Sequence, residues 1–186
     1  LGAGLTPGGL IGYLAALAIA KSVHELAHAY VATRYGVRVA HMGVAFVVMW
    51  PMLYTDTAES WKLSDPRQRF AIAGAGIGAE VALAALATLG WSIVPEGALR
   101  DALFFVATTS WVISVGINAS PFMRFDGYFL LADALDLPNL HERASALARA
   151  FLRRRLLGWK EPGPDYFPGR VRAFLILFAP VTGAVR

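Results

Sequence analysis

Residues 22–30 of the chain read SVHELAHAY. They lie near the end of an apolar run that begins at Leu10, and on a helix a spacing of four residues puts His24 and His28 on one face. Two imidazoles in that register can bind one zinc ion, while Glu25 between them can act on a water molecule that the metal activates. The pattern therefore predicts an HExxH metal site on a helix.

The composition around this motif distinguishes it from a chance match in a soluble helix. The chain has 186 residues, of which 56% are hydrophobic and 16% are charged, and its mean hydropathy is +0.51. Such a chain is too apolar for an ordinary soluble domain of this length. Because ionisable side chains at membrane depth are costly, they mark a functional site by default. We therefore expect an integral membrane protein whose first span carries a metal site.

The absence of cysteine and the placement of charge narrow the chemistry further. With no cysteine, a metal must be bound by histidine and carboxylate. The formal net charge is +4, but the basic residues lie between apolar stretches rather than on a soluble face, which argues against a nucleic-acid partner. The chain begins at Leu1 and its last apolar stretch runs to the end at Arg186, so we expect a fragment of a longer protein.

Apolar stretches long enough to cross a membrane as helices recur along the chain. They cover residues 10–35, 70–94 and 102–119, and a further one begins at Val171. Residues 37–60 are β-prone but are interrupted by Gly43 and Pro51, so they predict one or two strands that dip into the membrane and either pack on protein or line a watery cavity. The expected fold is an all-α integral membrane protein of about three transmembrane helices plus a fourth begun at the C-terminus, with a small membrane-dipping β segment, all in one core over residues 1–186.

Small and polar residues within the spans predict where helices meet. Ser110, Ser114 and Asn118 recur every four residues and form a polar line that should point inward. Gly74 and Gly78 form a small-xxx-small pattern, which lets another helix approach closely.

Three charged residues each admit two interpretations. Glu80 is either a site residue or a structural acid bonded to a neighbouring helix, on a face that it shares with Gly76. Lys21 either lines a wet cavity or extends toward the membrane surface, and we expect the second. Asp56 either lies near the metal or caps a turn, and a turn is again the expectation.

The segment after the third span offers another carboxylate. Residues 118–127 read NASPFMRFDG, in which Pro121 should end the helix and Gly127 permits a tight turn, so Asp126 is expected on irregular backbone beside the helix end. Residues 139–158 combine helically spaced apolar residues with arginines, which predicts a basic amphipathic helix on a membrane surface with anionic lipid. The alternative is a solvated helix packed on a soluble domain.

Basic residues indicate one orientation. Residues 34–69 hold 5 Lys and Arg and residues 124–172 hold 9, whereas residues 95–101 hold only Arg100. By the positive-inside rule the two basic segments are cytoplasmic, which places His24, His28 and Asp126 toward that side.

Two motifs in this order resemble the site-2 protease type of intramembrane zinc metalloproteases. The first is His24-Glu25-x-x-His28 and the second is Asn118-x-x-Pro121-x-x-x-x-Asp126-Gly127, and the resemblance covers roughly residues 20–140. The run FDGYFLLAD that follows Arg124 looks most like the bacterial branch of peptide zinc metalloproteases. The resemblance implies His24, His28 and Asp126 as ligands of one zinc ion and Asn118 as a group that stabilises an oxyanion. Glu25 would be the general base. The chain departs from many members at Glu80, where they have asparagine.

The expected function is zinc-dependent intramembrane hydrolysis of a peptide bond in a membrane-inserted or membrane-associated peptide. The expected location is the bacterial inner membrane, with the active site toward the cytoplasm, the lipid bilayer as a partner and a possible homo-oligomer. An alternative is a non-proteolytic peptide-binding membrane module linked to peptide maturation or export. A metal transporter would need further ligands along a path, but the remaining histidines, His41 and His141, are expected at the interface or surface.

Overall fold

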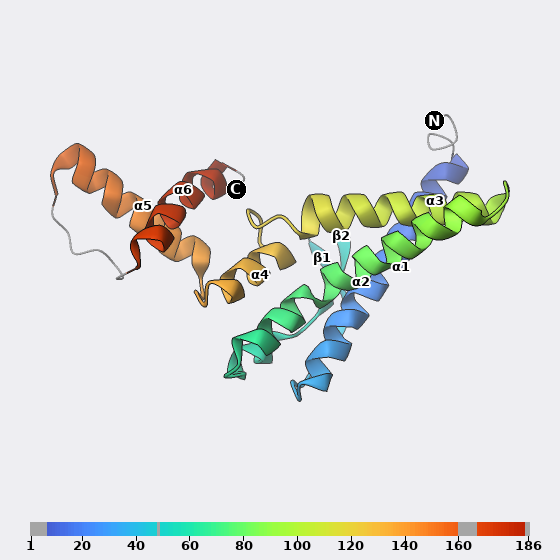
Figure 1. Ribbon diagram of the computed structural model, residues 1–186, viewed down its shortest axis with the longest axis horizontal. Coiled ribbons are helices and arrows are strands. Elements are labelled where there is room, and N and C mark those ends of the chain that lie inside the picture. The colour runs from blue at the N-terminus through green and yellow to red at the C-terminus, as the bar shows by residue number, and fades with distance from the viewer. Residues whose placement is uncertain (1–6, 48, 160–166, 185–186) are drawn as a thin grey trace. The chain divides into compact units, whose positions relative to one another are not determined.

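The computed structural model describes residues 7–47, 49–159 and 167–184 (Figure 1). The contacts divide the chain into two compact units, Leu1–Ser120 and Pro121–Arg186. The single core expected over residues 1–186 stays a prediction.

The first unit contains three long helical segments and one hairpin. Its elements are α1 (Pro7–Arg34), β1 (Met42–Val47), β2 (Trp50–Thr55), η2 (Ala58–Lys62), α2 (Pro66–Ile93), α3 (Ala98–Trp111) and the π-helix η3 (Val112–Asn118). A helix of 28 residues, the length of both α1 and α2, extends about 42 Å and exceeds the roughly 30 Å of a bilayer core. With α3 and η3 as the third candidate span, the predicted all-α membrane fold is confirmed.

Local sequence signals set the ends of α1 and α2. Gly36 has a φ of +75°, and the N–H of Val37 donates to the carbonyl of Ala32 at 2.9 Å, which is the bonding of a glycine-terminated helix. Asp65 caps α2 by accepting a hydrogen bond from the backbone N–H of Arg67 at 2.9 Å, and Pro66 occupies the first helical position. Both ends lie close to the predicted boundaries.

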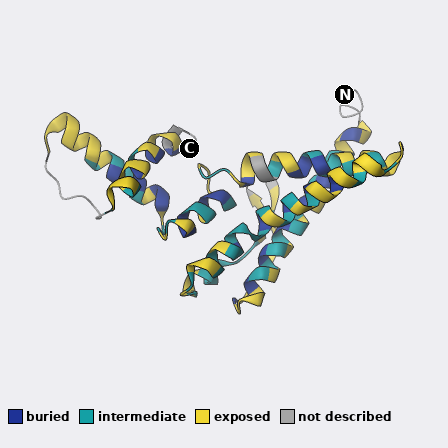
Figure 2. Ribbon diagram, viewed as in Figure 1, coloured by how far each residue is buried: buried dark blue, intermediate teal, exposed yellow. Residues whose placement is uncertain are grey.

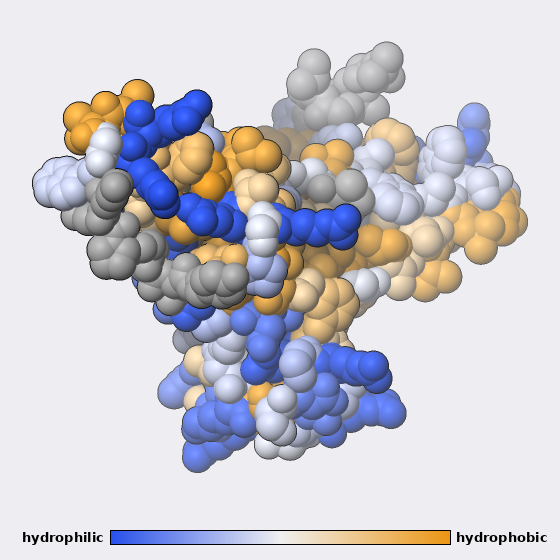
Figure 3. Space-filling view, turned by 60° about the vertical axis from the view of Figure 1, so that its left-hand side comes forward, coloured by the Kyte–Doolittle hydropathy of each residue, from blue (hydrophilic) through white to orange (hydrophobic). Residues whose placement is uncertain are grey.

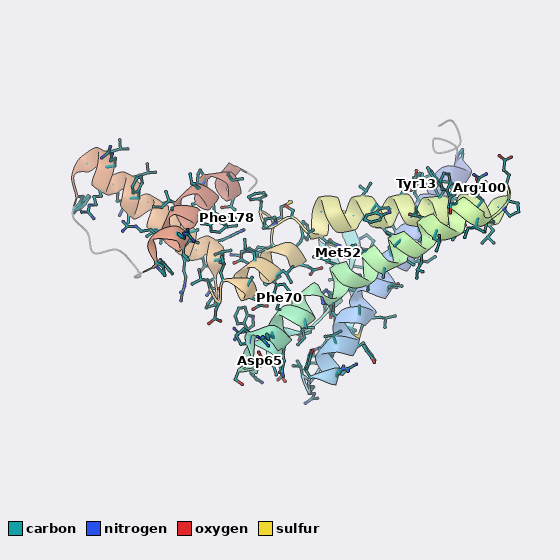
Figure 4. The ribbon with its side chains drawn as sticks, in the orientation of Figure 1. Tyr13, Met52, Asp65, Phe70, Arg100 and Phe178 are labelled. Atoms are coloured by element: carbon teal, nitrogen blue, oxygen red, sulfur yellow. The ribbon has the colours of Figure 1, made fainter. Side chains whose placement is uncertain are left out.

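The chain crosses the first unit back and forth. Figure 4 shows Tyr13 of α1 and Arg100 of α3 at one end of this unit and Asp65, just before α2, at the other. The three helical segments pack on one another in pairs. Figure 3 shows hydrophilic residues gathered at the lower end of the view, where Figure 1 places the end of α1 and the start of α2. This is the end that carries basic residues such as Arg34 and Arg67.

The outward faces of these helices are apolar. Buried residues are few along these helices, and intermediate and exposed residues make up the rest (Figure 2). Large exposed side chains on α1 and α2 include Leu10, Ile11, Leu14, Leu26, Leu86 and Leu89. Such side chains are suited to contact with lipid, because the hydrocarbon tails are as apolar as leucine.

The predicted β segment is a hairpin. Its antiparallel register pairs Val44 with Leu53 and Phe46 with Pro51, and Met49 in the connection has a φ of 65°. β2 packs on α1, where the hydroxyl of Thr55 donates to the backbone carbonyl of Glu25 at 3.0 Å. The hairpin is therefore attached to the helix at the HExxH motif.

The structure differs from the expected spans at two points. Gly78 is exposed, and a Cβ added there would meet nothing within 4 Å, so it is not a point of close helix approach; Gly76 is that point. The third span begins at Ala98 rather than 102, and its last two turns are π-helical. A π-helix has no simple sequence signal and occurs mostly as a local widening near functional sites.

The second unit is a separate helical cluster. It contains α4 (Asp126–Ala134), α5 (Leu140–Leu157) and α6 (Gly169–Ala184). Its core consists of Tyr128, Ala132, Leu140, Ala144, Leu147, Leu175, Phe178 and Ala179. The predicted helix over residues 139–158 is confirmed as α5, which ends at Gly158 with a φ of +64°. Its position on a membrane surface stays a prediction.

Candidate metal centre

The two histidines of the motif meet on the buried face of α1. Only 3% of His24 and 8% of His28 is exposed, and their Nε2 atoms lie 3.1 Å apart. Their ring planes are inclined at 72°. The helical spacing thus brings together two imidazole nitrogens, as predicted.

The other nitrogen of each ring faces a group that only accepts hydrogen bonds. His28 Nδ1 lies 2.8 Å from the backbone carbonyl oxygen of Ile72, and a carbonyl only accepts, so this nitrogen bears a hydrogen. His24 Nδ1 lies 3.2 Å from Oε1 of Glu80, and a carboxylate favours the proton on the facing nitrogen. In neutral rings with this arrangement both Nε2 atoms are acceptor nitrogens, and such a pair is suited to a cation.

These distances fit a zinc ion. Two nitrogens that are each about 2.0–2.1 Å from a tetrahedral zinc lie roughly 3.3 Å apart, close to the 3.1 Å found for His24 and His28. Gly76 of α2 supplies the space, because a Cβ there would overlap Nε2 of both histidines. A metal-bound histidine usually donates the N–H of its other ring nitrogen to a carboxylate or a backbone carbonyl, and Nδ1 of both histidines faces such a group here.

Glu80 of α2 contacts residues of α1 and η3. The sequence left open whether it is a site residue or a structural acid. It is fully buried, its Oε1 lies 3.2 Å from Lys21 Nζ, and its Oε2 accepts a hydrogen bond from Asn118 Nδ2 at 2.9 Å. The expectation that Lys21 extends to the membrane surface is wrong, because its ammonium group pairs with Glu80 inside the unit. The spacing of Lys21, His24 and His28 at i, i+3 and i+7 was the available signal for this shared face.

The remaining expected residues of the first unit are also placed. Glu25 is half-buried and lies between the two histidines on α1. Asp56 accepts a hydrogen bond from the backbone N–H of Ala58 at 3.0 Å, so its turn role is confirmed. His41 is exposed, as predicted.

In the second unit, the local surroundings of Asp126 and His141 differ from those predicted. Asp126 is half-buried and is the first residue of α4, so it begins a helix rather than standing on irregular backbone. The position suits a carboxylate, because a helix N-terminus favours negative charge. His141 is not at a surface: it is 4% exposed and its ring lies 4.3 Å from that of Tyr128.

Comparison with known families decides the class. The model of peptidase family M50 matches residues 12–119, which is more than half of the chain. The chain belongs to peptidase family M50. This is the site-2 protease family, so the protein is a metalloprotease of the site-2 protease kind and a membrane protein. The M50 match spans the HExxH motif, Glu80 and Asn118, whereas Asp126 lies beyond its end. Neither a curated protein nor a solved structure matches the chain.

Proposed function

We propose that this M50 protein is a zinc-dependent intramembrane endopeptidase that hydrolyses a peptide bond in a membrane-inserted or membrane-associated peptide. The observation that carries the proposal is the pair of Nε2 atoms of His24 and His28, 3.1 Å apart on the buried face of a membrane-length helix. The space at Gly76 supports it, since the opposing helix has no side chain where a metal would bind.

Asp126 is the proposed third protein ligand. It would add one carboxylate oxygen to the two imidazole nitrogens of His24 and His28, and the three residues are a candidate metal-binding group. Two imidazoles and one carboxylate form a donor set typical of catalytic zinc sites, which keep a fourth position open. The spacing of the second motif, from Asn118 through Pro121 to Asp126, supports this choice.

The chain supplies the acid–base chemistry. When bound, zinc supplies a Lewis acid that polarises the peptide carbonyl and lowers the pKa of water. Glu25, next to His24 and half-buried, takes the proton from the attacking water and delivers it to the leaving amine. Asn118 has a second amide N–H beyond the one given to Glu80, and this group is the proposed donor to the oxyanion.

The hairpin is the proposed substrate-binding element. A peptide bond within a helix is shielded, so the substrate must be extended before cleavage, and a strand edge can hold it by adding a strand. β2 pairs with β1, and Thr55 attaches the hairpin to the carbonyl of Glu25 at 3.0 Å. A peptide bound at this sheet is therefore held beside the general base. Its side chains would meet the exposed Val44 and Phe46 of β1.

The proposal includes the orientation of the protein in the membrane and its contact with lipid. The basic end of the first unit, with Arg34 and Arg67, is assigned to the cytoplasmic side, and the bacterial inner membrane is the proposed location. α5 carries exposed Arg149, Arg153, Arg154 and Arg155 and is proposed to lie on anionic lipid. The homo-oligomer stays a prediction.

Exchange of the general base tests the proposal. Because Glu25 is assigned to proton transfer and not to metal binding, Glu25→Gln should retain zinc and lower kcat by about 10²- to 10⁴-fold. The assay is cleavage of a membrane-inserted peptide together with metal analysis of the purified chain. Glu59→Gln, the same exchange on the exposed η2, is the control and should change neither quantity. Unchanged turnover in Glu25→Gln contradicts the proposed function.

A further inference from the structure

We infer that Glu80 is a positioning residue that fixes the orientation of both the His24 imidazole and the Asn118 amide, with its charge balanced by Lys21. The inference deepens the proposed function and rests on it. It concerns a carboxylate that the HExxH chemistry does not use.

The two oxygens of Glu80 have separate partners. Oε1 lies 3.2 Å from His24 Nδ1 and 3.2 Å from Lys21 Nζ, whereas Oε2 accepts from Asn118 Nδ2 at 2.9 Å. Glu80 itself is 0% exposed. One rigidly buried carboxylate therefore contacts a proposed metal ligand on α1 and the proposed oxyanion donor at the end of η3.

The carboxylate fixes both partners because an ionised carboxylate only accepts. A carboxylate 3.2 Å from Nδ1 favours the His24 tautomer that bears its proton there, and this tautomer leaves the lone pair of Nε2, 3.1 Å from His28 Nε2, available to a metal. Asn118 must present its NH₂ group, which fixes which way the amide faces. A glutamine at residue 80 would accept or donate equally well, so neither partner would be held in one state.

Lys21 explains how a charge is tolerated at this depth. Its side chain is 27% exposed, while that of Glu80 is 0% exposed, so the ammonium group both neutralises the acid and retains access to the outside of the unit. An unpaired buried charge is strongly unfavourable, whereas a paired one is tolerated. Lys21 and Glu80 are thus one functional unit, and a neutral amide at residue 80 would leave Lys21 without its counter-charge.

The first readout is zinc affinity. Loss of an outer partner of a metal-bound histidine lowers metal affinity by about 10- to 100-fold, so Glu80→Gln should show that loss in a chelator competition on the purified full chain. The double variant Lys21→Met, Glu80→Gln removes both charges, which avoids an unpaired ammonium group if Glu80→Gln alone fails to fold, and it should show the same loss. Thr88→Val is the matched control, because it also breaks a contact from α2 to the third span, 3.2 Å from Trp111 Nε1. It should keep wild-type affinity.

The second readout needs no metal. In the metal-free wild-type chain, the imidazole ¹⁵N shifts of His24 should report one tautomer, protonated at Nδ1, and Glu80→Gln should give a mixture of both tautomers. A purely structural role of Glu80 would not change this ratio. Thr88→Val should give the wild-type spectrum.

The outcomes separate the two claims. A wild-type chain that binds no zinc contradicts the proposed function, while the ¹⁵N spectra still decide the role of Glu80. Wild-type zinc affinity in Glu80→Gln or in the double variant overturns the inference, and so does an equal loss in Thr88→Val. A single Nδ1-protonated tautomer in Glu80→Gln overturns it as well.

Discussion

Among the described residues, two of the polar contacts between α2 and the third span differ in burial and charge. Glu80 and Asn118 are both buried and joined at 2.9 Å, with a charged acceptor. Thr88 and Trp111, two helical turns along α2, are exposed and joined by a neutral bond of 3.2 Å. The exposed hydrogen bond requires no functional explanation, because hydrogen bonds between membrane helices contribute only about 0.6 kcal/mol on average. The buried charge is costly, and its contact with His24 at 3.2 Å indicates why the fold retains it.

The largest expected effect comes from filling the space at Gly76, one turn before Glu80. Gly76→Ala would place a methyl group on Nε2 of His24 and His28. Because overpacking of this kind costs about 1–3 kcal/mol or displaces the rings, zinc affinity should fall by about 10- to 100-fold or more. Metal analysis after dialysis against a weak chelator measures the loss.

Gly78→Ala on the same helix is the control for that substitution. Its new methyl group would meet nothing within 4 Å, so zinc binding should not change. Stability should rise by up to about 1 kcal/mol, since alanine is the better helix former. Equal zinc content in the two variants would show that α2 does not border the metal position.

Breaking the charge pair at Glu80 is expected to change stability rather than zinc binding directly. Lys21→Met leaves the buried carboxylate without the ammonium group 3.2 Å away, so unfolding should become easier by on the order of 3 kcal/mol. The measurement is the denaturation midpoint in detergent. Adding Glu80→Gln should restore most of the loss, because the remaining groups are neutral. A double variant no more stable than Lys21→Met would contradict the charge pairing.

Local periodicity predicted much of the fold and half of the site. The spacing of His24 and His28 fixed their common face, since side chains four residues apart are neighbours on any helix. The hairpin followed from β-prone residues too few to cross as a helix, and α5 followed from its amphipathic pattern. Each of these features is determined by residues close together in the chain, so it can be predicted from the sequence alone.

Contacts between helices could not be predicted in the same way. The partner of Lys21 lies 59 positions along the chain at Glu80, and only the packing of α1 on α2 brings them together. The π-helical turns before Asn118 and the burial of His141 likewise depend on tertiary packing. The common face of Gly76 and Glu80 was predicted, but the closeness of Gly76 to the two histidines was not, because it depends on the packing of α1 on α2.

The central claim is that His24, His28 and Asp126 hold one zinc ion, and zinc X-ray absorption of the loaded chain tests it most directly. The account predicts one zinc per chain with two imidazole nitrogens at about 2.0–2.1 Å and oxygen ligands completing the shell. Asp126→Ala should lose an oxygen ligand, whereas Asp133→Ala on the same helix should leave the spectrum unchanged. A spectrum without two imidazoles, or one that Asp126→Ala does not alter, would contradict the claim.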